Sequence, residues 1–562
     1  MTSINTAPNR LLPMTGDIAL RASNASIPST VPVSGSGTMS DAIKGAMEGA
    51  MKGAENVISA PDSTRVTLTQ APPLANWPTY AQPVANGAVL NWRQAPSDAI
   101  SRLMSGNLST SSLGNRIDQL GAKLLFAIST GATSFSQSVV RSTSAAPATD
   151  TDLALRQSTL QAGADNQFAL SITTAGGAQV TVKLGSSDDG LSVEFNVTQG
   201  TLTDTERDSL GKLGDAFQNA VNGLAARPPV IDFSGLTDFD TSVLTSVDLA
   251  ATLGADTRTP QTLTFHADAA LRSMHVEGPS GKFDVDVDLK NVQAIGSPKA
   301  RQAALDAWQA RFDTAQSRGN GDASLMNMFK AAFVGLNRHY PPAPPFPRIA
   351  LNSADKSVLS GLADFNASIS QTSTSPNPMR PSEIDAFRYQ ISQSTQIGGT
   401  DTLDRTIAQQ TQATLSASYH RSLWAGVPLH LTSDPKSQNY EYVKIEDTAR
   451  SAVEVGYRQG LLAYAQASRS ASQTTQVQRY EMAKLVSDVT TPVSASSHSD
   501  LMTLLQSIMQ NDAARATRPS GRDAANDAAA DDVRKRTSLE GDPTRLKAAG
   551  VTALRFAAAE TA

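Results

Sequence analysis

The sequence predicts an α+β, β-rich fold in which antiparallel meanders pack with a few amphipathic helices, flanked by disordered, low-complexity tails. Apolar and polar residues alternate over residues 166–198 and again over residues 261–290, as they do in half-buried strands. Between these segments, apolar residues recur at helical spacing over residues 210–224. The strands and the helix would bury their apolar faces in a common core.

The composition divides the chain into seven segments, because tracts rich in Ser, Thr, Ala and Pro alternate with blocks of periodic apolar residues. The predicted segments are a disordered N-terminus (1–37), helical segments (38–130), a linker (131–163), an α+β domain (164–340), a proline-rich spacer (341–350), a second β-rich region (351–490), and a helix with a low-complexity C-terminal tail (491–562). The N-terminal segment has too few apolar residues to offset the entropy lost on ordering.

The first helix is predicted over residues 41–60, where Gly45, Gly49 and Gly53 lie along one line. Such a glycine-zipper-like line lets a second backbone approach closely, so these glycines are the candidate self-association site. Interleaved charges argue against a spanning helix but allow residues 40–60 to make peripheral contact with a membrane. The alternative is a frayed Ala/Gly-rich helix, since each glycine costs about 1 kcal/mol relative to alanine.

A second helix is predicted over residues 116–130, because its apolar residues follow the helical period. These residues are Ile117, Leu120, Leu124 and Ile128. The sequence then returns to Ser, Thr and Ala over residues 131–163, which is typical of a linker.

The α+β domain begins with a three-stranded meander over residues 166–198. A helix follows, because Thr203 and Glu206 form a capping-box pair at its start and Pro228–Pro229 end it. Three more strands are predicted over residues 261–290, where the period of two returns.

Helices over residues 299–318 and 324–337 are predicted to close this domain before the proline run. In the second β-rich region, residues 407–419 are predicted to form a long polar strand. Alternation continues at Tyr440 and Tyr442 and, after a break, at Val453, Val455 and Tyr457. The Ala- and Gln-rich residues 467–478 alternate weakly, so a strand and a helix fit them equally well.

The composition bounds the classes of function. The net charge of −5 over 562 residues provides no basic surface for phosphate contacts, so we expect no nucleic-acid partner. The absence of cysteine excludes disulfides, thiolate nucleophiles and cysteine-ligated metal sites. No stretch has the roughly 20 apolar residues of a transmembrane helix, and no classical secretion signal is recognisable. We therefore expect a cytoplasmic protein, or one exported by a signal-less bacterial secretion route.

His266 and His275 are the candidate metal ligands, because they could face each other across a predicted hairpin with Glu277 close by. Two histidines and a carboxylate can hold zinc with water in the open position. The simpler interpretation is that both histidines face solvent opposite the apolar side of the strands. We expect no metal and no cofactor on this interpretation.

Asp284 and Asp286 are the candidate catalytic residues. They alternate with valines and continue to Asp288, which places three carboxylates on one face of one strand. The simpler interpretation is an edge strand decorated with charge to prevent aggregation.

Serine-nucleophile and phosphate-loop motifs are absent from the sequence, so an enzyme is disfavoured. The favoured hypothesis is a non-catalytic structural or interaction protein of bacterial type, exported without a classical signal peptide, that binds protein partners or itself. The alternative is a hydrolase acting on a polymer, glycan or peptidoglycan, through carboxylates on a β scaffold.

Overall fold

The structure is a computed structural model that describes residues 79–84, 88–143, 149–342, 345, 347–517 and 524–548. All of these residues belong to one unit of the chain, Leu68–Ala562. The predictions for residues 1–37 and 40–60, including Gly45, Gly49 and Gly53, lie outside the described residues.

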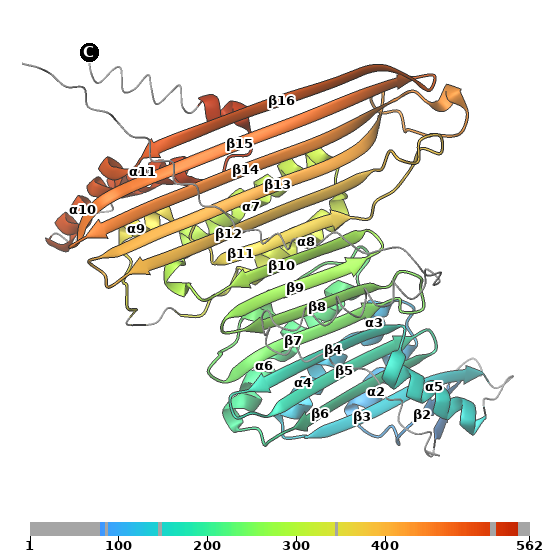
Figure 1. The fold of residues 1–562 in the computed structure, drawn as a ribbon. Helices are drawn as coiled ribbons and strands as arrows, with labels where there is room; N and C mark the ends of the chain where they lie inside the picture. The colour runs from blue at the N-terminus through green and yellow to red at the C-terminus, as the bar shows by residue number, and fades with distance from the viewer. Residues whose placement is uncertain are drawn as a thin grey trace, which may run out of the picture. The chain divides into compact units, whose positions relative to one another are not determined.

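One antiparallel sheet of sixteen strands organises the described residues (Figure 1). The shorter strands are β1 (Tyr80–Pro83), β2 (Ala88–Trp92), β3 (Ser134–Thr143), β4 (Asn166–Thr174), β5 (Gln179–Ser187), β6 (Gly190–Thr198), β7 (Leu244–Leu253), β8 (Gln261–Asp268), β9 (Leu271–Gly278), β10 (Gly281–Asp288) and β11 (Asp364–Gln371). The longer strands are β12 (Ala386–Gly399), β13 (Arg405–Ser422), β14 (Tyr440–Arg458), β15 (Leu461–Glu481) and β16 (Lys484–Asp500).

The strand order is β1-β2-β3-β6-β5-β4-β7, followed by β8 to β16 in sequence. The predicted meanders over residues 166–198 and 261–290 are present as β4–β6 and β8–β10. Because β10 pairs with β11, the two β-rich parts of the chain share one sheet. The predicted α+β fold with antiparallel meanders is therefore confirmed.

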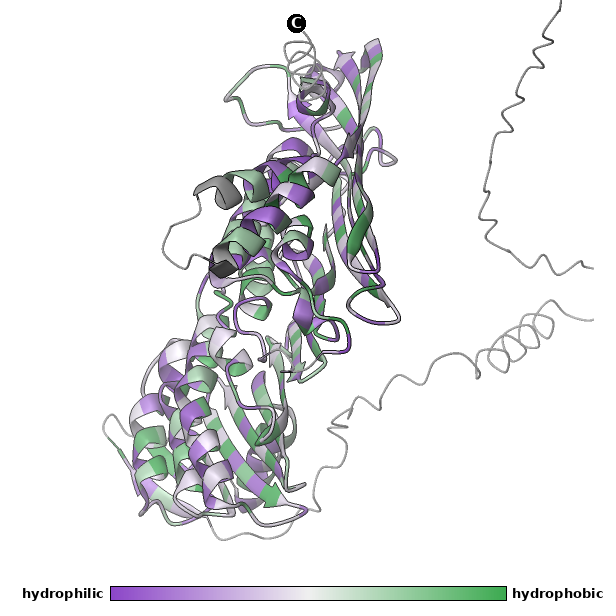
Figure 2. Ribbon diagram, turned by 90° about the vertical axis from the view of Figure 1, so that its left-hand side faces the viewer, coloured by the Kyte–Doolittle hydropathy of each residue, from purple (hydrophilic) through white to green (hydrophobic). Residues whose placement is uncertain are grey.

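The helices lie mainly on one face of the sheet (Figure 2). They are α2 (Ala99–Leu108), α3 (Leu113–Ile117), α4 (Leu120–Ser129), α5 (Asp150–Gly163), α6 (Asp204–Ala225), α7 (Pro298–Gly319), α8 (Ala323–Leu336), α9 (Ser353–Val358), α10 (Met502–Thr517) and α11 (Ala524–Thr537). We call this face of the sheet the helix side and the opposite one the open side. The apolar residues of the strands alternate towards the helix side and form a continuous core that includes Phe168, Phe283 and Tyr389.

The predicted linker at residues 131–163 is wrong, because this segment contains β3 and α5. In β3, Val139 joins the main core, while Val140 on the other side packs against Leu160 of α5. The helix lies so close to the sheet that a side chain at Gly190 would collide with Leu160. A strand buried on both faces does not show the alternation by which strands are recognised.

Two further boundaries differ from the prediction. The helix expected over residues 116–130 is divided into α3 and α4, because Gln119 adopts a left-handed conformation with φ of 59°. The segment that begins at residue 491 was expected to be helix and tail, but β16 extends to Asp500. From residue 491 onward its side chains are mostly small and polar, with Val493 the one large aliphatic residue, so only pairing with β15 identifies this part as a strand.

Candidate functional site

The five long strands end together at loops that we call the loop end. β12, β14 and β16 begin there, and β13 and β15 finish there. The loops are residues 372–385 before β12, residues 423–439 between β13 and β14, and the turn 482–483 between β15 and β16. They occupy the right-hand end of the long strands in Figure 1.

The three loops are hydrogen-bonded to one another. The backbone amide of Ala483 donates to the carbonyl of Gln438 at 3.2 Å, and that of Met482 donates to the side chain of Asn439 at 3.0 Å. The Arg380 guanidinium donates to the carbonyl of Ala483 at 2.8 Å. These bonds hold the loops in one arrangement.

His420 is the centre of a buried polar cluster beneath the loops. Its Nδ1 lies 2.6 Å from Oδ1 of Asp385 and its Nε2 lies 3.0 Å from Oε2 of Glu383. Ionised carboxylates only accept hydrogen bonds, so when Asp385 and Glu383 are both ionised both ring nitrogens donate and the side chain is an imidazolium. The Tyr440 hydroxyl also donates to Glu383, at 2.6 Å. The His420 side chain is only 1% exposed, so no substrate can reach this histidine.

Aromatic contacts and an amide complete the buried polar cluster, which we define as Asn377, Glu383, Asp385, His420 and Tyr440. The Asn377 amide donates to Tyr440 Oη and to Gln438 Oε1, both at 2.9 Å. The Tyr440 ring stacks on Tyr480 with 4.9 Å between their centroids. The cluster therefore attaches loops 372–385 and 423–439 to the open side of β13 and β14.

Protonation of His420 depends on the two carboxylates. Burial lowers the pKa of His420, but the hydrogen bonds and charges of Asp385 and Glu383 together outweigh it, so the pKa is raised. The cluster is thus most stable with a charged imidazole. Its geometry is that of a structural support for the loops.

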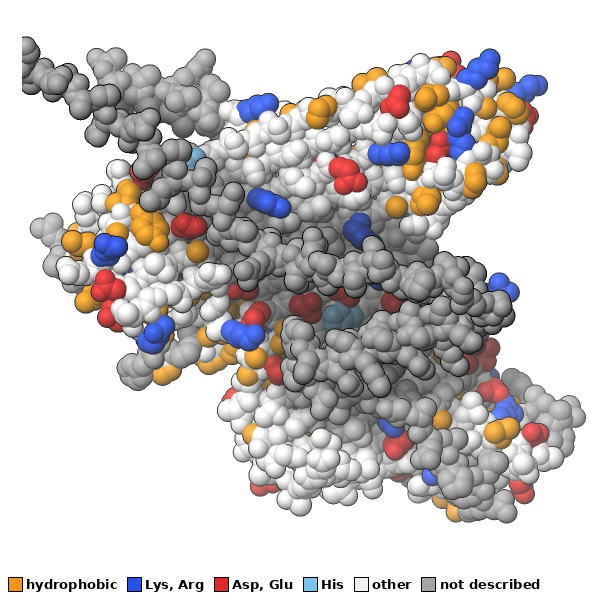
Figure 3. Space-filling view, in the orientation of Figure 1, with side chains coloured by type: hydrophobic (Ala, Val, Ile, Leu, Met, Phe, Trp, Pro, Cys, Tyr) orange, Lys and Arg blue, Asp and Glu red, His pale blue; other side chains and the backbone are white. Residues whose placement is uncertain are grey.

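Seven large apolar side chains are exposed at the loop end, with exposed fractions between 41% and 58%. We call them the apolar tip. They are Met379, Ile384, Trp424, Val427, Met482, Leu485 and Val486. In Figure 3, hydrophobic side chains gather at this end of the long strands together with Lys and Arg side chains. An exposed apolar group of this size indicates an interaction surface.

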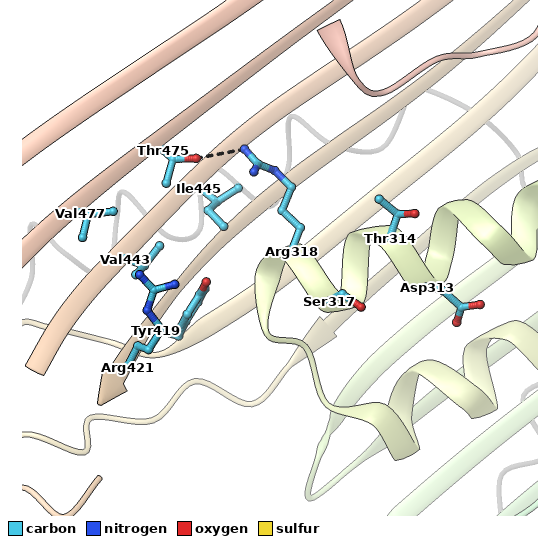
Figure 4. Close-up of a pocket in the computed structure, with 10 residues that line it drawn as sticks. All are labelled: Asp313, Thr314, Ser317, Arg318, Tyr419, Arg421, Val443, Ile445, Thr475 and Val477. Atoms are coloured by element: carbon cyan, nitrogen blue, oxygen red, sulfur yellow. Dashed lines mark hydrogen bonds between the residues drawn. The ribbon is translucent and has the colours of Figure 1, made fainter. Parts of the chain in front are cut away.

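A groove lies on the helix side next to the loop end, between the last turns of α7 and strands β13–β15 (Figure 4). Its volume is about 690 Å³. Its floor is largely apolar and is formed by Tyr419, Val443, Ile445 and Val477. Asp313, Thr314, Ser317, Arg318 and Arg421 surround it.

Arg318 fixes α7 at the edge of this groove. Its guanidinium donates two hydrogen bonds to the carboxylate of Asp447 on β14 and one, at 3.1 Å, to the hydroxyl of Thr475 on β15. The last residue of α7 lies very close to the sheet, since a Cβ at Gly319 would lie 2.8 Å from the Phe387 ring. The floor beyond α7 is therefore left uncovered by any helix that the structure describes.

β16 is one edge of the sheet, and β15 is its strand partner among the described residues. The amide of Leu501 donates to the carbonyl of Ala465 at 3.0 Å, which fixes the alternation along β16. Odd-numbered residues from 487 to 499 direct their backbone groups at β15, and even-numbered ones from 488 to 500 direct theirs outward. Pro492 is in the outward set, so its missing N–H removes one outward donor.

Asp284 and Asp286 lie on the open side, with side chains 45% and 37% exposed. Their strand, β10, is not an edge strand but lies between β9 and β11, so the interpretation as a decorated edge is wrong. His275 Nδ1 lies 2.9 Å from Oδ1 of Asp284. Burial raises the pKa of Asp286, which suits a general acid, although no cavity described above includes it.

His266 and His275 share the open side but are not directly opposed. His266 lies across from Ser273, and His275 across from Thr264. His266 Nδ1 is instead 2.6 Å from Oδ1 of Asp248, and this hydrogen bond raises the pKa of His266.

Glu277 lies opposite Lys282 on β10 and Thr262 on β8. Within the described ranges, no group of three or more His, Asp or Glu side chains could hold a metal ion.

The buried polar cluster was not predicted from the sequence. Glu383 and Asp385 are 37 and 35 residues away from His420 in the chain. The spacing of the two acids matches no known motif. The only sequence signal is that His420 directly follows the predicted strand over residues 407–419.

Comparisons with protein-family models, curated proteins and solved structures found no significant match to this chain. In the part of the chain that the structure describes, no helix is both long and apolar enough to cross a membrane.

Proposed function

We propose that this chain is a non-catalytic interaction protein that binds an extended segment of a protein partner along strand β16. The single observation that carries the proposal is the edge of β16, a strand of 17 residues whose outer side pairs with no strand in the part of the chain that the structure describes. A strand edge with outward N–H and C=O groups can bind a further strand through main-chain hydrogen bonds.

The side chains of β16 define the chemistry of such a partner. Val489 and Val493 lie on the helix side, where Val489 continues the row formed by Val443 and Val477. Among the even-numbered residues of β16, whose backbone groups point away from β15, Thr, Ser and Asp side chains lie on the open side. A matching segment has apolar residues at alternate positions towards the valines and hydroxyl or amide side chains between them.

The other edge of the sheet is much less suited to strand addition. β1 has four residues and ends at Pro83, and short, proline-containing edges resist pairing. Within β16 itself, Pro492 separates the outward donors of Asp488 and Thr490 from those of Ser494, Ser496 and His498. We expect the partner segment to pair with one of these two stretches.

Hydrogen exchange of the full chain tests this proposal, read by mass spectrometry at single-residue resolution. The probe is a peptide of alternating Val and Thr with solubilising ends. We expect the outward amides of Ser494, Ser496 and His498, or those of Asp488 and Thr490, to exchange rapidly in the free protein and slowly with the peptide. Protection that grows with protein concentration alone would identify a second copy as the partner.

A pair of variants separates main-chain from side-chain binding. Ser496→Pro removes an outward donor without removing a bond to β15, whereas Ser496→Ala keeps the donor. We expect only the proline variant to lose peptide protection in the stretch 494–498. Outward amides that are already slow in the dilute free protein, or that no peptide protects, would disprove the proposal.

The bacterial type of the protein and its export without a classical signal belong to the same proposal. They are supported by the Ser/Thr-rich start of the sequence and the absence of cysteine. Residues 1–37 fused to a reporter should direct it out of a bacterial cell, and retention of the reporter would contradict export. No specific observation favours the hydrolase alternative, because Asp284 and Asp286 lie on an exposed sheet face.

A further inference from the structure

The apolar tip is built from three separate loops, and this makes it a surface rather than a set of isolated residues. Met379 and Ile384 belong to the loop before β12, Trp424 and Val427 to the loop between β13 and β14, and Met482 to the turn before β16. The hydrogen bonds from Arg380, Met482 and Ala483 described above hold these loops together.

The loops are also supported from below. Leu429 and Leu431 pack against Tyr440, Tyr442 and Tyr480. The buried polar cluster holds the same loops through His420. Binding at the apolar tip would therefore cost little ordering entropy, since the loops are already fixed.

The shape of this surface distinguishes between two kinds of partner. None of the residues that line the groove next to the loop end belongs to the apolar tip. A protein partner needs packing complementarity, whereas the lipid–water interface adapts to any projecting apolar side chain. Trp424, 58% exposed, is the type of side chain that favours this interface.

The charges around the apolar tip are nearly balanced. Arg421 bonds Glu441 at 3.0 Å, and Arg479 lies 2.7 Å from Glu481. Arg380 lies 3.8 Å from Glu383, and His420 lies between Glu383 and Asp385. The other charges of the loops and adjoining strand ends are those of Lys436, Lys444 and Lys484 and those of Asp434 and Asp488. A nearly neutral surface of this kind suits zwitterionic lipid headgroups and would not require anionic ones.

We propose that the apolar tip inserts into the surface of a zwitterionic lipid bilayer, with the long strands as a rigid support. Trp424, Val427, Leu485 and Val486 enter the interface, and the lysines stay at the headgroups. This binding site shares Leu485 and Val486 with the start of β16 but does not include the outward amides of residues 488–498. Vesicle binding and peptide protection are therefore separate measurements, and either proposal can fail without the other.

Co-sedimentation of the full chain with phosphatidylcholine vesicles tests the proposal. We expect binding that high salt leaves unchanged and that added phosphatidylglycerol changes little. Trp424 should report insertion by a shift of its emission to shorter wavelength, since Trp92 and Trp308 are 0% and 4% exposed. The fourth tryptophan, Trp77, lies outside the described residues, so the comparison is made with the Trp424→Phe variant, which keeps Trp77. The shift should be absent in the Trp424→Phe variant.

Two double variants locate the site. Leu485→Asp with Val486→Asp should weaken vesicle binding about tenfold or more, because buried apolar groups supply the affinity. Leu403→Asp with Leu461→Asp is the matched control, since these leucines are 57% and 74% exposed at the opposite end of the long strands. The control should bind as the unmodified chain does.

Three results would overturn the lipid proposal. The first is the absence of sedimentation with phosphatidylcholine vesicles. The second is binding that needs phosphatidylglycerol and is lost in high salt, which would indicate a charged surface elsewhere. The third is a tip variant that binds vesicles normally. If vesicles do not bind and the tip variant alters the mass in analytical ultracentrifugation, the apolar tip is instead a protein interface.

Discussion

The imidazole of His420 lies between two carboxylates, with Nε2 only 3.0 Å from Oε2 of Glu383 and a side chain that is 1% exposed. Burial of an ion pair stabilises a fold only when every partner is present, because a single buried charge is costly. The loops that carry the apolar tip should therefore be most stable when the His420 imidazole is protonated.

Replacement of His420 by glutamine should destabilise the loop end. Loss of the cation leaves Asp385 without its counter-charge and Glu383 with only the more distant Arg380, at 3.8 Å. We expect this to lower the free energy of unfolding by about 3–5 kcal/mol. Urea denaturation measures this. His430→Gln is the matched control, since that histidine is exposed in loop 423–439, and it should change stability by less than about 0.5 kcal/mol.

The contribution of His420 should also depend on pH. Because its pKa in the folded state is raised above the ordinary value of 6.5, the stabilisation is complete below pH 6.5 and is lost as the pH rises through the raised pKa. Denaturation at a series of pH values should show this loss in the unmodified chain and not in His420→Gln. An equal pH dependence in both would contradict the assignment.

Arg405 and Asp355 form a second buried ion pair, with side chains 4% and 0% exposed and Nη2 at 2.7 Å from Oδ2. Asp355→Asn should cost about 3–5 kcal/mol, because the guanidinium is left buried without a counter-charge. Glu441→Gln breaks the exposed pair with Arg421 and should cost less than about 1 kcal/mol. Similar losses in both variants would show that burial does not matter here.

Gly319→Ala should separate α7 from the sheet. The added Cβ would lie 2.8 Å from the Phe387 ring and 3.1 Å from Cβ of Ala417, an overpacking that costs about 1–3 kcal/mol. Gly106→Ala is the control, because nothing lies within 4 Å of its Cβ position in α2. Gly106→Ala should stabilise the protein by about 0.5–1 kcal/mol. Thermal denaturation should therefore show a lower melting temperature for Gly319→Ala and a higher one for Gly106→Ala.

The capping box of α6 should make stability fall in acid. Burial raises the pKa of Glu206, but hydrogen bonds from Thr174, Thr203 and Gly176 outweigh it and lower the pKa to about 2. Its stabilisation is present above the ordinary value of 4.5 and is lost as the pH falls from 4.5 towards 2. Glu206→Gln should cost about 1–2 kcal/mol at neutral pH and remove this dependence, whereas Asp204→Asn should leave it unchanged.

The strands that alternate cleanly were predictable from the sequence. β4 to β6 and β8 to β10 bury their large apolar side chains mainly on one face, so apolar and polar residues alternate along their sequences. β3 was not predictable, because Val139 and Val140 are buried on opposite faces. β16 was missed for the opposite reason, since neither of its faces is fully buried.

The candidate site was much less predictable than the fold. The histidines and aspartates singled out from local patterns, such as His275 and Asp284, pair with each other on an exposed face. His420 instead acquires its partners through the pairing of β13 with β14 and the return of loop 372–385 across them. Long-range placement of this kind leaves no local periodicity.

Strand order has a consequence for how the chain is made. Within the described residues, only the pairs β3–β6 and β4–β7 join strands that are not consecutive in sequence. A ribosome releases the chain from its N-terminus, so from β8 onward each strand emerges when the strand that it pairs with has already left the ribosome. This part of the sheet can therefore grow in one direction during synthesis, and β16, the last of the described strands, ends that growth with no described strand on its outer side.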